Sequence, residues 1–272
     1  MNLIELFARD KAAYMAHVYY GDPNEDFSIK EIKALCESGV SIIELGIPFS
    51  DPTADGPVFQ RACERALAAG MTPGKVIEGI VKLRDAGITQ PIVVTSYYNI
   101  IYHMGVGTFV RRIKDSGACA LIVPDVPIEE ADDLLAAGDE HGIDIIFLVA
   151  PTTPDDRLKK ILSVARGFVY VVSVAGVTGA RESLEEATLK LIERVRAHSD
   201  IPLLVGFGIS KQEQAKAAVT AGADGVITGS AIGSIYEQHL DDPDASFDEI
   251  RAFAQGIRAG IEEGVRKGDR IL

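Results

Sequence analysis

Residues 143–150 read IDIIFLVA, a nearly continuous apolar run with a single charged residue. Two later runs have the same character, FVYVVSV at 168–174 and IPLLVGF at 201–207. Strands with one solvated face alternate apolar and polar residues, whereas continuous apolar runs are typical of strands that are buried on both faces. The runs therefore predict an α/β protein with a parallel sheet.

Short runs rich in β-branched residues recur along the whole chain, and helical patterns lie between them. The expected strands are residues 14–20, 41–46, 91–97, 119–124, 143–149, 167–174, 201–206 and 224–228. Strands that alternate with helices in this way predict a (β/α)8 TIM barrel, which commonly reaches about 250 residues as one domain. We expect a single barrel domain over residues 1–272, with an extra N-terminal helix, an additional helix after strand 2 and a short phosphate-binding helix after strand 8.

A doubly wound open sheet is the alternative architecture. The segment GFGISK at 206–211 has two glycines and then Lys211 where a third glycine would complete the dinucleotide-binding fingerprint. In TGSAIG at 228–233, the serine comes one position too early for the nucleophile elbow of a serine hydrolase. The barrel is therefore favoured over both of these classes.

Two helix starts carry recognisable signals. Thr72 followed by Pro73 predicts an N-cap with proline at the first helical position, and Ser28 with Glu31 matches a capping box. We expect helices to begin at both places.

Composition excludes several classes of protein. The net charge of -13 argues against binding to nucleic acid or to an anionic membrane surface, because both need basic patches. The three cysteines lie far apart in apolar contexts, and the five histidines form no HxxxH or Cys/His pair, so we expect neither disulfides nor a metal. The N-terminal residues do not form a signal peptide, and no apolar run is long enough to span a bilayer. We expect a cytoplasmic enzyme or binding protein.

The stretch ELGIPFSDPTADGP at 44–57 places three carboxylates at and after the end of a strand. Catalytic groups of barrels come from the carboxyl ends of strands and from the loops that follow. Glu44 ends the second strand, and Asp51 and Asp55 follow in a loop that three prolines stiffen. The alternatives are a solvated strand-end acid for Glu44 and turn formation for the two aspartates. Spacing alone does not decide between these readings.

Glycine-rich segments follow the last three expected strands. GFG at 206–208 ends the seventh, and TGSAIG at 228–233 follows the eighth. Barrels often bind phosphate with the loops in these two places and with the N-terminus of an extra helix. The loop AGVTGARES at 175–183 is either a lid or an ordinary flexible loop, and its Thr178 could hydrogen-bond an aspartate such as Asp55. We therefore expect a phosphorylated substrate.

Six motifs occur together in one order: ELGIPFSDPTADGPVFQ, YYN, VPDVPIEE, SVAGVTGA, GFGIS and GSAIG. They resemble the α subunit of tryptophan synthase over nearly the whole chain. The resemblance implies retro-aldol cleavage of indole-3-glycerol phosphate to indole and glyceraldehyde 3-phosphate, with no metal or organic cofactor in this chain. A stand-alone lyase that releases indole and a non-catalytic subunit that only activates its partner are the alternatives. The presence of both Glu44 and Asp55 argues against the second.

The resemblance also implies roles for individual residues. Glu44 corresponds to the general acid/base, Asp55 to the acceptor of the indole N–H hydrogen bond, and Tyr170 to a residue beside the acid. Tyr97 lies in the loop after strand 3, near the pocket and the partner interface, unless it only packs at the strand end. The remaining expected substrate-binding residues are Thr178, Gly179, Gly208, Gly229 and Ser230.

The family further implies a partner, a β subunit that contains pyridoxal phosphate and receives indole in an α2β2 heterotetramer. Asp51 and Pro52 are expected at that contact. One departure from the family lies at the end of strand 1, where His17, Tyr19 and Tyr20 stand in place of apolar or smaller residues. Because side chains alternate along a strand, one of the two tyrosines should face the helices.

Overall fold

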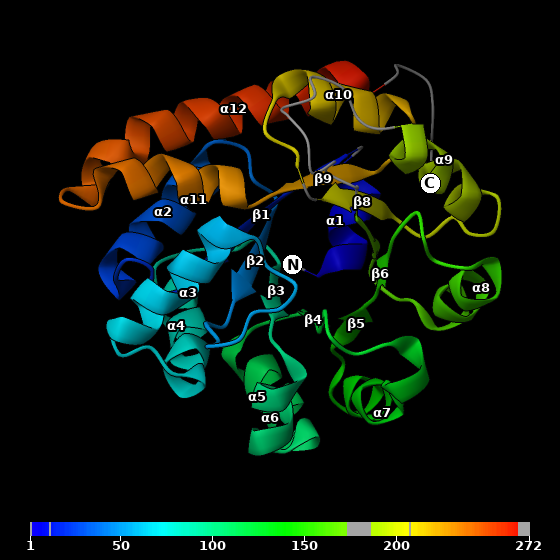
Figure 1. The fold of residues 1–272 in the computed structure, drawn as a ribbon, viewed down its shortest axis with the longest axis horizontal. Helices are drawn as coiled ribbons and strands as arrows, with labels where there is room; N and C mark the ends of the chain where they lie inside the picture. Colours follow the sequence, from blue (N-terminus) through cyan, green and yellow to red (C-terminus); the bar gives the residue numbers. More distant parts are fainter. Residues whose placement is uncertain (1, 11, 173–185, 207, 266–272) are drawn as a thin grey trace.

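The computed structural model describes residues 2–10, 12–172, 186–206 and 208–265 (Figure 1). Parallel strands form a nearly closed barrel in the order β5-β4-β3-β2-β1-β9-β8-β7-β6, and helices surround it. The strands are β1 (Ala13–Tyr19), β2 (Ile42–Gly46), β3 (Ile92–Thr95), β4 (Ala120–Ile122), β5 (Asp144–Ile146), β6 (Leu148–Val149), β7 (Val169–Val172), β8 (Leu203–Gly206) and β9 (Gly225–Thr228). The predicted TIM-barrel class is confirmed, and the extent of one domain over residues 1–272 stays a prediction.

The expected fifth strand, residues 143–149, is interrupted at one residue. β5 pairs with β4 and β6 pairs with β7, and only Phe147 separates the two segments. The backbone N–H of Tyr170 still donates to the carbonyl oxygen of Phe147 at 3.0 Å. β5 and β6 therefore take the place of one barrel strand. The eight expected strands correspond to the nine labelled here, because the expected strand at 143–149 carries two labels.

Helices cover the outside of the barrel (Figure 1). They are α1 (Leu3–Arg9), α2 (Glu25–Glu37), α3 (Pro57–Ala68), α4 (Pro73–Asp85), α5 (Tyr98–Met104), α6 (Val106–Ser116), α7 (Asp132–His141), α8 (Asp155–Val164), α9 (Glu186–Arg196), α10 (Gln212–Thr220), α11 (Ser230–Tyr236) and α12 (Phe247–Gly264), with short 3-10 helices at Ile128–Glu130, Glu237–His239 and Pro243–Ser246. The expected extra helices are present as α1, as the pair α3 and α4 after β2, and as α11 after β9.

Helix α1 packs against residues of the barrel interior. Leu3, Leu6 and Phe7 belong to the same buried cluster as the inward-facing strand residues, and the ring of Phe7 meets the edge of Phe168 with centroids 6.4 Å apart. Burial of these apolar side chains stabilises the barrel by the usual hydrophobic contribution. The extra helix thus extends the interior core.

Side chains alternate between the barrel interior and the helical layer. On β1, Ala13 and Met15 join the interior cluster, whereas Tyr14, Ala16 and Val18 join the cluster beneath the helices. The same period of two runs along the other strands, as pleated geometry requires. This alternation decides which strand-end residues can reach the site.

The two predicted helix starts have different outcomes. Thr72 is the N-cap of α4, and its side chain accepts the N–H of Lys75, as expected. The prediction for Ser28 is wrong, because α2 begins at Glu25 after the N-cap Asn24. The hydroxyl of Ser28 instead accepts a hydrogen bond from the backbone N–H of Gly21 at 2.9 Å inside the protein. Buried backbone N–H groups need a hydrogen-bond partner, and Ser28 provides one for Gly21.

Candidate active site

A cavity of about 280 Å³ lies at the carboxyl ends of the strands. Strand-end residues from β1, β2, β3, β7 and β9 line it, together with the segment before α3 and the start of α11. Its walls include these predicted site residues: Glu44, Asp55, Tyr170, Gly208, Gly229 and Ser230. The topology therefore brings together residues that lie up to 186 positions apart in the chain.

Glu44 is almost completely buried, with 2% of its surface exposed. The hydroxyl of Thr95 donates to Oε1 at 2.7 Å, and among the described residues nothing donates to Oε2. The pKa of Glu44 is raised to about 8, chiefly by burial; the hydrogen bond from Thr95 opposes the rise and the charge of Asp55 adds to it. At neutral pH, Glu44 is therefore mainly protonated and can donate a proton.

His17 lies beside Glu44 because the β1–β2 register pairs these two residues. Its Nδ1 is 3.4 Å from Oε1 of Glu44. Burial lowers the pKa of His17 to about 3, so the imidazole is neutral where Glu44 is protonated. The contact is therefore one between two neutral groups, although its distance alone would allow an ion pair.

Asp55 is held by two tyrosines. Tyr97 donates its hydroxyl to Oδ2 at 2.5 Å, and Tyr19 donates to the same oxygen at 2.7 Å. Burial raises the pKa of Asp55, while the hydrogen bonds from Tyr97 and Tyr19 counteract this effect. The hydroxyl of Tyr97 also accepts a hydrogen bond from the backbone N–H of Ala54 at 3.0 Å. Tyr97 therefore contacts both the carboxylate of Asp55 and the backbone of the loop that carries it.

The start of α11 lies close to α3 at the edge of the cavity. A Cβ on Gly229 would lie only 2.6 Å from Cζ of Phe59, so a larger residue would push the two segments apart. Gly229 is the N-cap of α11 and Ser230 its first residue, and both line the cavity. Gly208 has a φ of +74°, a conformation that favours glycine. The small residues thus allow close approach of backbone to the cavity.

Three of the predicted site residues that the structure describes, Tyr97, Asp51 and Pro52, are not in the cavity wall. Asp51 is exposed on the loop before Asp55 and accepts a hydrogen bond from the hydroxyl of Ser50 at 2.6 Å, and Pro52 follows it. Thr178 and Gly179 lie outside the described residues. Exposure of Asp51 leaves it accessible to a partner surface.

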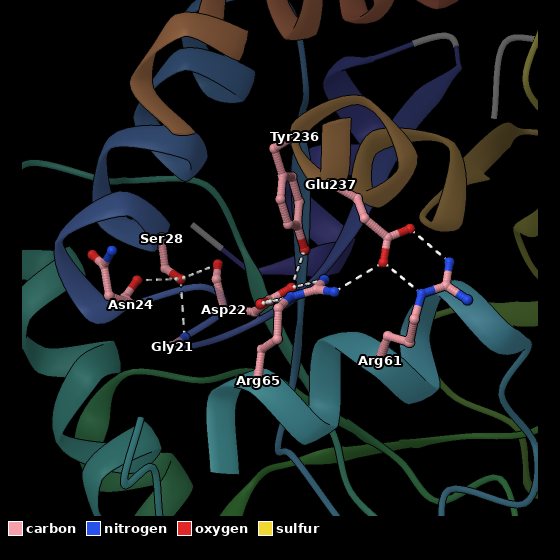
Figure 2. A network of polar contacts seen from close by, with 8 residues as sticks. All are labelled: Gly21, Asp22, Asn24, Ser28, Arg61, Arg65, Tyr236 and Glu237. Carbon is pink, nitrogen blue, oxygen red and sulfur yellow. Dashed lines mark hydrogen bonds and ion pairs between the residues drawn. The ribbon is translucent and has the colours of Figure 1, made fainter. Parts of the chain in front are cut away.

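Outside the cavity wall, a buried carboxylate binds an arginine (Figure 2). Asp22 has no exposed surface; its Oδ1 and Oδ2 accept Nε and Nη2 of Arg65 at 2.7 and 2.8 Å. The hydroxyl of Tyr236 donates to Oδ2 at 2.5 Å. Two parallel bonds of this kind give a charged pair with a defined geometry.

The network in Figure 2 continues to Glu237, which accepts Nη1 of Arg65 at 2.8 Å and two bonds from Arg61 at 2.6 Å. Both arginines lie on α3, while Tyr236 and Glu237 lie at the end of α11. The two helices border the cavity at their first turns. The network therefore connects them at a distance from the cavity.

Sequence patterns did not identify all of these residues. Thr95 lies in the cavity wall, but no motif included it. Phe59 lies within a quoted motif and Tyr19 within the noted departure at the end of strand 1, but neither was assigned a role in the site. Alternation along β3 gave a usable signal for Thr95, which lies two residues after the inward-facing Val93. No local signal predicts the pairing of Asp22 with Arg65.

The part of the chain that the structure describes contains no group of three or more His, Cys, Asp and Glu side chains that could hold a metal ion. Within the same residues, no helix is long and apolar enough to cross a membrane. Cys36, Cys63 and Cys119 are free thiols.

Comparison with known proteins identifies the family. A family model described as "Tryptophan synthase alpha chain" matches residues 3–262. The chain belongs to the tryptophan synthase alpha chain family. A curated tryptophan synthase alpha chain of Methanocaldococcus jannaschii is 51% identical over 238 residues, which cover 88% of this chain and 84% of the relative. That of Methanoregula boonei is 44% identical over 265 residues, which cover 97% and 100%.

Solved structures agree with this assignment. Tryptophan synthase subunit alpha of Legionella pneumophila superposes with a TM-score of 0.86 at 31% identity, covering 96% of this chain and 99% of that one. A chain of tryptophan synthase from Mycobacterium tuberculosis gives a TM-score of 0.83 at 36% identity, with 95% and 96% covered. Members of the family cleave indole-3-glycerol phosphate to indole and glyceraldehyde 3-phosphate. As a member of this family, the chain is a carbon–carbon lyase of tryptophan biosynthesis.

Proposed function

We propose that Glu44 is the general acid/base of this cleavage and that Asp55 accepts the hydrogen bond of the indole N–H. The observation that carries the proposal is the contrast between two carboxyl groups in one cavity. Glu44 is held neutral by burial, whereas two tyrosine hydroxyls favour the ionised form of Asp55. Paired groups with different proton affinities are the usual basis of acid and base roles.

The first step protonates the indole ring. Glu44 donates its proton to C3 of the substrate, which becomes tetrahedral and leaves a positive charge on the ring nitrogen. Asp55, as a carboxylate, stabilises that charge through its hydrogen bond to the N–H. A carboxyl group with a pKa of about 8 is suited to this donation near neutral pH.

The second step breaks the carbon–carbon bond. Glu44, now a carboxylate, removes the proton of the glycerol hydroxyl next to the ring. The O–H electrons form the aldehyde carbonyl, and the electrons of the broken bond return to the ring and neutralise its nitrogen. Glu44 has then given one proton and regained one, so the enzyme is ready for another turnover. Tyr170, in the cavity wall, borders the reacting ring.

The substrate phosphate is bound by residues that follow β8 and β9. Gly208, Gly229 and Ser230 offer backbone N–H groups there, which suits an anion in a protein of net charge -13. Gly179 and Thr178, which lie outside the described residues, complete this set in the proposal. No cofactor takes part in this chain.

The indole product passes to a pyridoxal-phosphate-containing β subunit in an α2β2 heterotetramer. The family supports such a partner, and the exposed Asp51, followed by the half-buried Pro52, supports contact through the loop that carries Asp55. The three free thiols are consistent with a cytoplasmic location.

The test measures indole release from indole-3-glycerol phosphate with and without a β subunit. Glu44→Gln should lower kcat by about 10²–10⁴-fold with the fold retained. Turnover close to that of the wild type in Glu44→Gln would contradict the assignment. Full activity without the partner would favour a stand-alone lyase, and inactivity of the wild type in both conditions would favour a non-catalytic subunit.

A further inference from the structure

Tyr19 belongs to a departure from the family pattern, yet its hydroxyl reaches the loop carboxylate. We propose that Tyr19 is a positioning residue that fixes Asp55 so that one carboxylate oxygen faces the substrate N–H. The inference rests on the proposed function of Asp55 and adds a residue that acts through it. Tyr19 itself is absent from the cavity wall, which agrees with an indirect role.

The ring of Tyr19 is fixed by its surroundings. Only 2% of the residue is exposed, and the ring meets the edge of Phe59 at 5.2 Å and lies 5.1 Å from His17. The β1–β2 register pairs Tyr19 with Gly46, and a Cβ there would lie 2.7 Å from the tyrosine ring. The space for this ring therefore depends on a glycine directly across the sheet.

Both side-chain hydrogen bonds that the Asp55 carboxylate accepts from described residues go to the same oxygen, Oδ2. Tyr19 comes from β1 and Tyr97 from the N-cap position of α5, and both donate to Oδ2. No described residue donates to Oδ1. A single donor would let the carboxylate rotate about it, whereas two donors from different elements restrict this rotation. Oδ1 is thus left to accept the N–H of an indole ring, since Asp55 lines the cavity.

The same contact supports the charge of Asp55. A hydroxyl donor stabilises a carboxylate more than a neutral carboxyl group, so Tyr19 opposes the effect of burial on Asp55. The pKa of Tyr19 is itself raised well above its ordinary value by burial and by the charge of Asp55, so its proton stays available for donation.

A matched pair of variants tests the proposal. Tyr19→Phe removes the hydroxyl and keeps the ring. Tyr20→Phe is the control, because Tyr20 also donates to a carboxylate, Glu25 Oε1 at 3.0 Å, but packs against Gly79 on the helical side of β1. The same group is removed from two neighbouring residues, the last residue of β1 and the residue directly after it. Thermal unfolding of both variants reports any shared effect on stability.

The readout is the preference for a ring N–H. Indole and benzofuran, which lacks the N–H, are compared as competitive inhibitors of cleavage. A hydrogen bond to a charged group predicts that wild type and Tyr20→Phe favour indole by about ten- to a hundredfold. Tyr19→Phe should reduce this preference by roughly threefold or more and move the acidic limb of the kcat/KM profile to higher pH.

The outcomes separate the two proposals. If Tyr19→Phe keeps the wild-type preference and the wild-type acidic limb, the positioning role of Tyr19 is wrong while the role of Asp55 stands. If the wild type itself does not discriminate indole from benzofuran, the role of Asp55 is wrong and the role of Tyr19 falls with it. Loss of preference in Tyr19→Phe but not in Tyr20→Phe supports both.

Discussion

Glu44→Gln should remove activity and, at alkaline pH, increase stability. In the wild type, burial raises the pKa of Glu44 from 4.5 to about 8. A carboxyl group with a raised folded-state pKa is fully stabilising below the unfolded pKa, and its contribution is lost as pH rises towards the folded pKa. Between pH 4.5 and 8, at about 1.4 kcal/mol for each pH unit, the wild type should lose at most about 5 kcal/mol through this group.

Glutamine at position 44 does not titrate and has the same shape. Its carbonyl oxygen can still accept the hydroxyl of Thr95, which in the wild type donates to Oε1 at 2.7 Å. The two proteins should therefore have similar stability near pH 5. By pH 8 the variant should be more stable by several kcal/mol, with an upper limit of about 5.

Urea unfolding at pH 5, 6, 7 and 8 measures this difference directly. Other titrating groups are present in both proteins, so their contributions largely cancel in the comparison. His17, with a folded-state pKa of about 3, stays neutral in both folded proteins over this range, and its titration in the unfolded chain is common to both. Equal m-values would show that the unfolding reaction is the same. A stability difference that stays constant from pH 5 to 8, or a variant that is less stable at pH 8, would refute the reasoning. The alkaline limb of wild-type kcat/KM should also fall near pH 8.

Three further changes test other parts of the site. Asp22→Asn should cost about 1.5–3 kcal/mol in urea unfolding, because it removes the buried carboxylate that binds Arg65 and leaves Glu237 as the remaining carboxylate partner of the guanidinium; a loss below 1 kcal/mol would contradict this. Gly229→Ala should raise KM by roughly tenfold through its contact with Phe59, whereas Gly256→Ala, with open space around the added Cβ, should leave KM unchanged. Asp51→Ala should preserve indole release by the isolated chain and weaken β-subunit binding in titration calorimetry; unchanged affinity would remove Asp51 from the interface.

The fold could be predicted because its signal is local and repeated. Each apolar run and each helical pattern independently indicates one strand or helix, and alternation of the two leaves few topologies. The exception is the fifth strand, where the pairing is interrupted at Phe147. Nothing in the apolar sequence around that residue marks the interruption, because hydrogen-bond pairing depends on both neighbouring strands.

Part of the site could also be predicted, because barrel topology decides which strand ends lie together. The carboxyl ends of parallel strands meet at one end of a barrel, so Glu44 and Tyr170 had to approach one another. Family resemblance gave their roles. Register between strands is not visible in one sequence, and it decides that His17 pairs with Glu44 and Tyr19 with Gly46. The departure at the end of β1 was noticed, but its contacts with the two carboxyl groups could not be predicted.

The pKa of each of the carboxyl groups of Glu31, Glu44 and Asp55 depends first on its burial and then on the donors that reach it. Burial raises the pKa of Glu31, Glu44 and Asp55 alike. Glu31 Oε1 has no donor among the described residues, and the pKa of Glu31 is raised well above its ordinary value. Glu44 has one hydroxyl donor and reaches about 8, while Asp55 has two tyrosine donors that oppose its burial. In the proposed mechanism, the second hydroxyl donor, Tyr19 at the end of β1, favours the ionised form of Asp55 in the same cavity as the proton donor Glu44.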